Sequence, residues 1–440
     1  MQKDIVELQE REPHFKALIP FIVFVVFYTG LSIAARDFYS VSMPVAFLVA
    51  SASAILLDRR ISIERKVDIY ARGMGDGNIM IMCLIFILAG AFAASAKAMG
   101  AVDSTVLIAR HLIPENLIVA GFFVVSCFIS LAIGTSCGTI AALTPIALGL
   151  VGSGGSAAMM IGAVVGGSMF GDNMSMISDT TIAAARTQNV NMRDKFVMNF
   201  KMAIPAAVLA VILYLIMGRT AVAAGDLAPI NWKNIVCTLP YLGILLGALV
   251  GLNVMALLFM GTVISVVIGC LLGGLNFFSA LNEVGKGALG MAETLIVALL
   301  AGGLLSLIRH NGGVNYILDK IEKAASGRRG CEFGIALLVS LVNLFTANNT
   351  VAIVVAGPIA RNLADKYNCD PRRSASILDI ASCVVQGLLP YGAQILIAAG
   401  IAQGAGLKLS PLALAGAAYY PMLLAAALIV SIVIAGNKKH

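Results

Sequence analysis

The sequence predicts an all-α polytopic membrane protein, and its composition and apolar pattern both lead to that class. Of 440 residues, 59% are hydrophobic and only 12% are charged, a balance typical of membrane proteins rather than of soluble ones. Apolar runs of about 20 residues, the length that spans a bilayer as a helix, recur along nearly the whole chain. No soluble domain longer than a loop interrupts them, so we expect a single membrane domain.

Polar residues interrupt these runs at a few places, and the segment 166–181 is the clearest example. It places Asp172 and Asp179 within a long apolar region, together with Gly171, which can break a helix. A carboxylate in hydrocarbon costs several kcal/mol, so such a segment persists at membrane depth only where protein or water surrounds it. The segment therefore predicts a binding site inside the protein.

The chain contains an internal repeat. Polar interruptions recur in both halves, and paired interruptions of this kind are typical of transporter architecture. We therefore expect two repeats, residues 1–218, with a short cytoplasmic N-terminus, and residues 219–440. A shift of 212 residues also aligns four glycines within a matching apolar pattern, so that Gly73, Gly75, Gly90 and Gly100 fall on Gly285, Gly287, Gly302 and Gly312.

The distribution of lysine and arginine predicts that the two repeats are inverted. If residues 114–151 and 331–364 are re-entrant hairpins, each repeat has five crossings, and 23 of the 30 basic residues lie on one side. If both segments span the membrane instead, the distribution becomes 17 against 13. Because cytoplasmic loops are rich in Lys and Arg, we favour the hairpins, a cytoplasmic (inner) membrane location and two cytoplasmic termini. An odd number of crossings inverts the second repeat.

The expected helices follow from apolar runs that end at charged or turn-forming residues. In the first repeat the crossings are 17–36, 41–58, 77–97, 155–185 and 195–218, and the fourth is broken near Gly171. In the second they are 234–250, 252–274, 290–308, 374–403 and 412–436, and the fourth is broken near Gly387. Residues 59–72 and 279–289 are charged on one side, which predicts interfacial helices.

The tips of the two predicted hairpins carry polar side chains. In the first, two glycines that allow a turn bracket Thr135 and Ser136, whose hydroxyls are hard oxygen ligands. The corresponding tip of the second repeat is Asn348, Asn349 and Thr350. The alternative for the first tip is a helix kink in which the hydroxyls bond back to their own helix. Two asparagines without a ligand are costly in a bilayer, so we expect both tips to bind an ion or substrate.

The broken helix of the first repeat offers further oxygen ligands for a cation. Asp172 and Asp179 are seven residues apart, and Asn173, Ser175 and Ser178 lie between them. If the chain is unwound there, these oxygens converge on a dehydrated Na⁺, so the two aspartates are Na⁺ candidates. Asp179 has an alternative role as the cap of the following helix.

A third carboxylate, Asp379, lies in the apolar run that follows the basic loop 361–373. We expect it to face a cavity and bind an ion or substrate, or else to pair with Arg372 or Arg373 near the interface.

The cysteines and histidines indicate neither a cofactor nor an enzyme. The eight cysteines and four histidines are scattered, with no spacing typical of disulfides or metal ligands and no Ser-His or Cys-His set. The net charge of +7 is explained by cytoplasmic loops that face anionic lipid, so we expect membrane lipid and no nucleic acid as a partner.

At its polar segments the sequence resembles the NhaC-type sodium/proton antiporter family, within a larger ion-transporter group built on inverted repeats with re-entrant hairpins. The resemblance covers nearly the whole chain and rests on residues 134–139 with Pro145 and on residues 170–181. The family commonly has tryptophan after the serine of the first motif, and histidine and proline where Asn173 and Met176 stand here. These departures keep both aspartates of the second motif but remove a titratable side chain beside them.

The resemblance and the oxygen-rich segments together predict a secondary active transporter with no cofactor. We favour a Na⁺/H⁺ antiporter whose aspartates bind Na⁺ when deprotonated and exchange it for H⁺ on the other side of the membrane. The alternative is a Na⁺- or H⁺-coupled transporter of an amino acid or carboxylic acid, by symport or exchange, because the family also includes members that transport such solutes. The large apolar surface permits a homodimer.

Overall fold

The computed structural model describes residues 12–35, 42–57, 61–112, 114, 117–151, 156–176, 178–218, 229–249 and 252–435. Throughout these residues the chain is helical and contains no β-strand, as predicted for an all-α membrane protein. The first half holds α1 (Ile19–Ala35), α2 (Met43–Leu57), α3 (Ile63–Met74), α4 (Gly77–Ala98), α5 (Ala101–Leu112), α6 (Ile118–Ile133), α7 (Ser136–Leu150), α8 (Ala157–Met174), α9 (Asp179–Gln188) and α10 (Met192–Met217), preceded by the short helix η1 (Phe15–Leu18).

The second half repeats this order of helices. It holds α11 (Trp232–Leu249), α12 (Val254–Leu271), α13 (Phe277–Leu289), α14 (Ala292–His310), α15 (Gly313–Ala324), α16 (Gly327–Thr346), α17 (Asn349–Lys366), α18 (Pro371–Leu388), α19 (Ala393–Gly404), α20 (Pro411–Ala417) and α21 (Tyr419–Ala435). α1 to α9 correspond in order to α11 to α19, and the long α10 corresponds to the bent pair α20 and α21. The inversion of one half relative to the other stays a prediction.

The two halves contact each other closely at glycines that belong to the internal repeat. α4 packs on α13, and α3 packs on α14. A Cβ on Gly90 would overlap the carbonyl of Gly287, and a Cβ on Gly287 would overlap that of Gly90; Gly73 and Gly302 block each other in the same way. Only residues without a side chain allow backbones to approach this closely, which explains the glycines at the matching positions Gly90 and Gly302.

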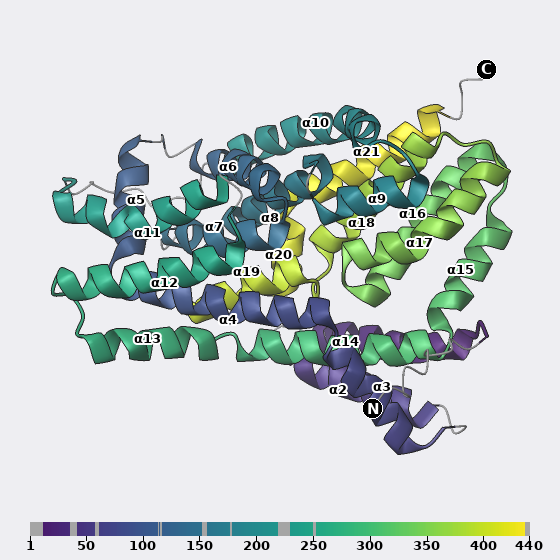
Figure 1. The fold of residues 1–440 in the computed structure, drawn as a ribbon, viewed down its shortest axis with the longest axis horizontal. Coiled ribbons are helices and arrows are strands. Elements are labelled where there is room, and N and C mark those ends of the chain that lie inside the picture. Colours follow the sequence, from purple (N-terminus) through teal and green to yellow (C-terminus); the bar gives the residue numbers. More distant parts are fainter. Residues whose placement is uncertain are drawn as a thin grey trace.

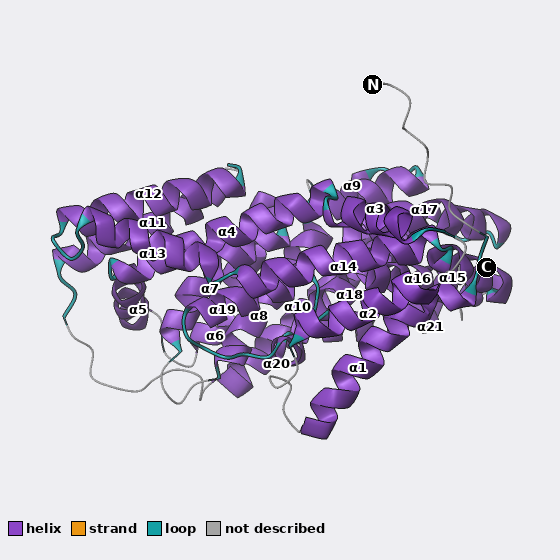
Figure 2. Ribbon diagram, turned by 90° about the horizontal axis from the view of Figure 1, so that it is seen from below, coloured by secondary structure: helices purple, strands orange, loops and turns teal. Residues whose placement is uncertain are grey.

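Several helices are long and apolar enough to cross a membrane. Among the described residues five pass this test, and a sixth is a pair bent by 57°, Pro411–Ala417 with Tyr419–Ile434. α4, α12, α13 and α14 run along the long axis of the molecule (Figures 1 and 2). The five helices are Ile79–Ala98, Met192–Met217, Phe277–His310, Gly327–Thr346 and Pro371–Gly404.

The segment predicted as an interfacial helix, residues 279–289, is helical and belongs to a longer apolar run, and its place at the membrane interface stays a prediction. This segment is α13, which continues into α14 as one run of 34 residues, Phe277–His310. Gly290, at the junction, keeps helical backbone angles (φ −60°, ψ −17°), so no break separates the two helices. A glycine within a helix lowers its stability but does not by itself end it.

Both segments predicted as hairpins fold as two helices joined by a tight turn. α6 and α7 meet at Gly134, and α16 and α17 meet at Ala347. Both residues have positive φ, 75° for Gly134 and 47° for Ala347. Glycine adopts this conformation freely, whereas alanine there costs about 1 to 2 kcal/mol, so the second tip is held in place by the contacts that surround it.

The helix breaks lie a few residues beyond the predicted positions. α8 stays helical through Gly171 to Met174, and α18 stays helical through Gly387 to Leu388. Each glycine instead allows a neighbouring helix to approach closely. A Cβ on Gly171 would overlap Ser130 of α6, and a Cβ on Gly387 would lie 2.8 Å from Pro421 of α21. α8 ends at Met174 and α9 begins at Asp179, while α18 ends at Leu388 and α19 begins at Ala393.

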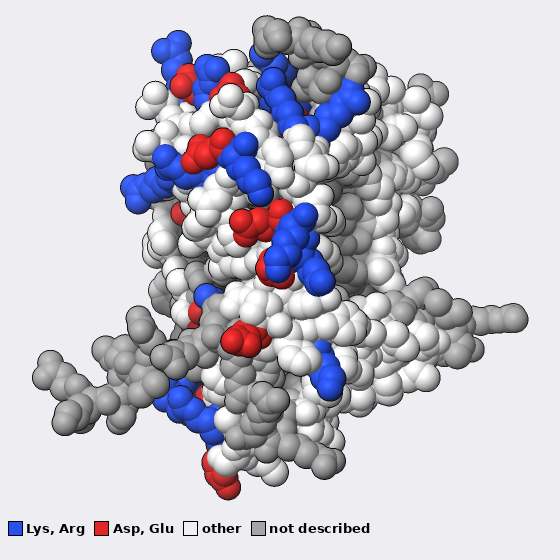
Figure 3. All heavy atoms as spheres, turned by 90° about the vertical axis from the view of Figure 1, so that its right-hand side faces the viewer, with Lys and Arg blue, Asp and Glu red and all other residues white. Residues whose placement is uncertain are grey.

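Charged side chains spread over one end of the molecule. Figure 3 shows the end that lies on the right of Figure 1, where α15, α16 and α17 are found, with Lys, Arg, Asp and Glu across its surface. This distribution resembles the basic side that the sequence predicts, while the orientation in the membrane stays a prediction. Exposed basic residues of these helices and of the start of α18 are Lys320, Lys323, Arg328, Arg329, Arg361, Lys366 and Arg372.

Candidate functional site

The tips of the two hairpins meet at the carboxylate of Asp172. Ser136, at the first tip, donates its backbone N–H to Asp172 Oδ1 at 3.0 Å and its hydroxyl to Oδ2 at 2.6 Å. Asn349, at the second tip, donates its side-chain amide to Oδ2 at 3.4 Å. Asp172 itself is only 5% exposed. Donors from both halves of the chain thus surround one buried carboxylate.

Small residues bring the first hairpin to Asp172. A Cβ on Gly167 would overlap the carbonyl of Phe123, and one on Gly171 would overlap the side chain of Ser130. Ser130 also donates its hydroxyl to the carbonyl of Ser168 at 2.7 Å. α6 therefore lies directly against the last two turns of α8, and this contact places the hairpin tip beside the carboxylate.

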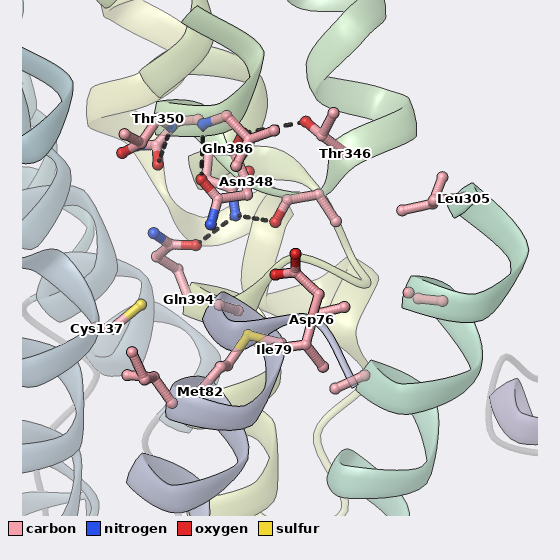
Figure 4. A pocket seen from close by; sticks show the side chains of 18 of the residues that line it. Asp76, Ile79, Met82, Cys137, Leu305, Thr346, Asn348, Thr350, Gln386 and Gln394 are labelled. Atoms are coloured by element: carbon pink, nitrogen blue, oxygen red, sulfur yellow. Dashed lines mark hydrogen bonds between the residues drawn. The ribbon is translucent and has the colours of Figure 1, made fainter. Parts of the chain in front are cut away.

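Asp172 opens onto a cavity of about 610 Å³. Figure 4 shows this cavity from close by, with Asp76 and Asn348 among the labelled residues that line it. Eight of the residues predicted to bind an ion or substrate line this cavity, and they come from both hairpins, α8 and the start of α9: Thr135, Ser136, Asp172, Ser178, Asp179, Asn348, Asn349 and Thr350.

A chain of side-chain amides connects the two hairpin tips. Gln386 of α18 donates to the carbonyl of Ala347 at 3.0 Å and to Gln394 Oε1 at 2.8 Å. Gln394, at the start of α19, donates in turn to the hydroxyl of Ser136 at 3.0 Å, which bonds to Asp172. Figure 4 shows Gln386 and Gln394 facing each other beside the cavity. The break between α18 and α19 therefore supports the carboxylate through Ser136.

The two aspartates predicted as Na⁺ ligands have different surroundings. Asp172 is buried in the last turns of α8, whereas Asp179 is exposed as the first residue of α9, after the N-cap Ser178. Asn348 likewise caps a helix, since its side chain accepts a hydrogen bond from the N–H of Val351 at 3.0 Å. Asp179 and Asn348 also line a second, smaller cavity of about 300 Å³.

Two predicted residues contribute to packing around the site rather than to the lining of its cavity. The side-chain amide of Asn173 donates to the carbonyl of Met169 and to the hydroxyl of Tyr420. Ser175 donates its hydroxyl to the carbonyl of Leu131 at 3.0 Å. These bonds fix the C-terminal end of α8 against α21 and α6.

Asp379 has a partner that the sequence did not suggest. Its Oδ2 lies 2.6 Å from the ammonium of Lys195, and the two side chains are 0% and 1% exposed. The predicted pairing with Arg372 or Arg373 is wrong, because Arg373 lies against Glu332 at 2.7 Å and Arg372 against Asp370 at 2.9 Å. Lys195, in the first turn of α10, is buried within the helices.

Three carboxylates are buried in the described part of the chain, and only one of them has no ion pair there. Glu332 pairs with Arg373, and Asp379 pairs with Lys195. Asp172 is held by neutral donors alone. A buried charge without a counter-ion is costly, and a proton or a cation bound at Asp172 would relieve this cost.

The sequence reasoning missed several charged residues of the cavity. Asp76 precedes α4 and points into the pocket in Figure 4, while Arg309 and His310 come from the end of α14. A signal for Asp76 was present, since residues 73–78 form a polar, glycine-rich segment before an apolar run. Arg309 and His310 gave no such signal, because they end an ordinary apolar helix.

The carboxylate of Asp172 and the hydroxyls of Thr135, Ser136 and Thr350, which line the same cavity, are oxygens of the kind that a hard monovalent cation binds. In the described residues there is no group of three or more His, Cys, Asp or Glu side chains that could hold a metal ion. Long apolar helices, two hairpins whose tips meet and a buried carboxylate beside a cavity are features of membrane transporters built from repeats.

The chain belongs to the Na⁺/H⁺ antiporter family, whose sequence model matches residues 8–219 and 220–436. The protein is therefore a multi-pass membrane transporter, and the predicted resemblance to the antiporters is confirmed. The family match begins anew close to the predicted boundary between the repeats.

Individual relatives differ in the solutes that their names state. The malate-2H⁺/Na⁺-lactate antiporter of Bacillus subtilis is 23% identical over 424 residues, which cover 89% of this chain and 90% of the relative. The Na⁺/H⁺ antiporter NhaC of the same organism is 25% identical over 355 residues, covering 71% and 75%. Among solved structures, the Alcanivorax borkumensis YdaH transporter matches with a TM-score of 0.39 and 14% identity, covering 82% of this chain and 86% of the other.

Proposed function

We propose that the protein is a secondary antiporter that exchanges Na⁺ for H⁺ at Asp172. The observation that carries this proposal is the position of Asp172, which is the buried carboxylate without an ion pair in the described residues and lies where both hairpin tips meet. Membership of the Na⁺/H⁺ antiporter family supports it.

Competition at one carboxylate accounts for exchange. Asp172 carries a single negative charge, so it binds either a Na⁺ ion or a proton, and each departure of one ion makes room for the other. The hydroxyl of Ser136 donates to the empty carboxylate, but a hydroxyl also accepts, so it can turn and add an oxygen ligand when Na⁺ is bound. Thr135 and Thr350 place further hydroxyls along the same cavity.

The hairpins supply the alternating access that exchange requires. Their tips contact the same carboxylate from different halves of the chain, so movement of one half against the other opens the site to one side at a time. We place the protein in the cytoplasmic membrane, with lipid around its apolar surface and both termini in the cytoplasm. Cysteines introduced at the exposed positions Lys408 and Arg372 should label from opposite faces; labelling from the same face would refute this topology.

Sealed proteoliposomes with a pH-sensitive dye test the exchange directly. Addition of Na⁺ should dissipate an imposed pH gradient, and K⁺ or Li⁺ added in turn should show the cation selectivity. If Na⁺ alone leaves the gradient unchanged in vesicles that contain folded protein, Na⁺/H⁺ exchange is refuted.

Coupled exchange of a carboxylic acid is the second candidate, and the cavity favours it. About 610 Å³ is more than a bare Na⁺ ion occupies, and Arg72, Arg309 and His310 lie among its lining residues, where they suit an organic anion. A relative named for malate and lactate supports the same idea. In the dye assay, a requirement for one carboxylic or amino acid in addition to Na⁺ would select this function over simple exchange. A homodimer stays a prediction that the oligomeric mass in detergent would test.

A further inference from the structure

The ammonium group of Lys195 fills a position that is lined by oxygen atoms. It lies 2.6 Å from Asp379 Oδ2, 2.7 Å from the hydroxyl of Thr181 and 3.3 Å from the carbonyl oxygen of Asn173. A lysine ammonium has three N–H donors and no acceptor, so these three oxygens satisfy it completely. Lys195 is 0% exposed, and the position is closed to bulk water.

These three oxygens are of the kinds that a hard cation binds: a carboxylate, a hydroxyl and a backbone carbonyl. They come from α18, α9 and α8. The carbonyl of Asn173 is available because α8 ends at Met174, and the last carbonyls of a helix have no partner within it. The break between α8 and α9 therefore leaves the carbonyl of Asn173, the residue after Asp172, available to a cation.

Asn199 holds this position together independently of the lysine. Its side-chain amide donates to Asp379 Oδ2 at 2.7 Å and to the carbonyl of Asn173 at 2.8 Å. Its own oxygen accepts the hydroxyl of Ser376 at 2.6 Å. Two of the three oxygens around the ammonium are thus fixed at their spacing by a neighbouring side chain, and we expect them to stay in place when the lysine is shortened.

We infer that Lys195 is a built-in cation that occupies a second monovalent-cation position of this protein, and that Na⁺ binds there when the lysine side chain is removed. The tethered ammonium neutralises Asp379 and excludes a mobile ion from it. One consequence rests on the proposed function: because Asp379 is neutralised, Asp172 is the single carboxylate at which a transported cation binds.

Equilibrium binding of radiolabelled Na⁺ to the purified full-length protein tests the inference. Lys195→Ala should bind one more Na⁺ per chain than the unchanged protein, and its melting temperature should rise in NaCl relative to choline chloride. Lys195→Ala/Asp379→Asn lacks both charges and should lose the additional Na⁺. Lys195→Ala/Thr181→Val keeps the carboxylate but lacks one oxygen, and should bind the additional Na⁺ more weakly.

Any of three results would overturn the inference. Lys195→Ala binds no additional Na⁺, or it fails to fold in NaCl as well as in choline, or the additional Na⁺ persists when Asp379 is also changed. The Asp172→Asn background separates this question from the proposed function: Asp172→Asn should bind no Na⁺, and Asp172→Asn/Lys195→Ala should bind one. If Asp172→Asn still binds Na⁺ as the unchanged protein does, the role of Asp172 is refuted while the comparison at Lys195 remains decisive.

Discussion

Replacing Asp172 by asparagine removes one charge at the meeting point of the hairpins and keeps the size of the side chain. The asparagine carbonyl can still accept the N–H of Ser136, which lies 3.0 Å from Asp172 Oδ1. Its amide takes the place of Oδ2, so the hydroxyl of Ser136 must turn from donor to acceptor, and Asn349 loses an acceptor at 3.4 Å. We expect the fold to survive, because removing a buried charge that has no counter-ion also removes its desolvation cost.

The loss of Na⁺ affinity follows from Coulomb's law. Two unit charges about 4 Å apart attract by about 4 kcal/mol at an effective dielectric constant of about 20, and each 1.4 kcal/mol is about a tenfold change in affinity. Asp172→Asn should therefore weaken Na⁺ binding on the order of a thousandfold, and Na⁺ should no longer dissipate a pH gradient at concentrations that saturate the unchanged protein.

The dye assay in proteoliposomes measures this effect, with Asp319→Asn as the matched control. Asp319 lies on α15, its side chain is 37% exposed, and it pairs only with Lys323 at the surface, where such pairs contribute little. The control should exchange like the unchanged protein. A folded Asp172→Asn protein that exchanges Na⁺ with unchanged apparent affinity would refute the assignment of Asp172 as the ligand.

Two further perturbations test the packing and the electrostatics around the site. Gly171→Ala places a Cβ on Ser130 and should destabilise the protein by about 1 to 3 kcal/mol and slow exchange. Gly121→Ala is the control: its added Cβ meets no neighbouring atom within 4 Å, so it should be neutral or stabilising by up to about 1 kcal/mol. Equal melting temperatures of the two variants would contradict this packing. Although burial disfavours its charge, hydrogen bonds and the positive charge of Arg372 hold the pKa of the Asp370 carboxyl below its usual range. A lowered folded pKa contributes stability that is present above the unfolded value, about 3.9, and is lost as the pH falls through the folded value. The hydrogen-exchange protection factors in the first turn of α18, which correct for the slower intrinsic exchange in acid, should therefore fall as the pH drops below about 4, and Asp370→Asn should remove this dependence.

The sequence predicted the hairpin tips and the helix breaks because they leave local signals. Glycine, hydroxyl and amide residues within apolar runs are conspicuous, and the structure places Thr135, Ser136 and Asn349 on one cavity with Asp172. The prediction failed where a residue's role depends on a neighbouring helix. Gly171 was taken for a helix break, yet it allows Ser130 to approach, and the break itself lies beyond Met174.

Pairing of buried charges left no trace in the sequence. Lys195 stands at the beginning of an apolar helix, a position shared by many lysines that reach the membrane surface, and Asp379 follows a loop that contains three arginines. Nothing in either segment indicates that these two side chains meet. Their ion pair at 2.6 Å changes the role expected for Asp379, from ligand of a mobile ion to partner of a fixed ammonium.

The amino-acid sequence by itself determined the class of protein, the helical segments, the two polar tips and the short set of carboxylates that a membrane interior does not tolerate without a reason. Those properties depend on composition and on neighbours along the chain. The tertiary structure alone decided which of these carboxylates has an ion pair and which lies among neutral donors. The free energy of a buried charge is set by the groups within a few ångströms of it, and around Asp172 and Asp379 those groups come from helices that lie far apart in the sequence.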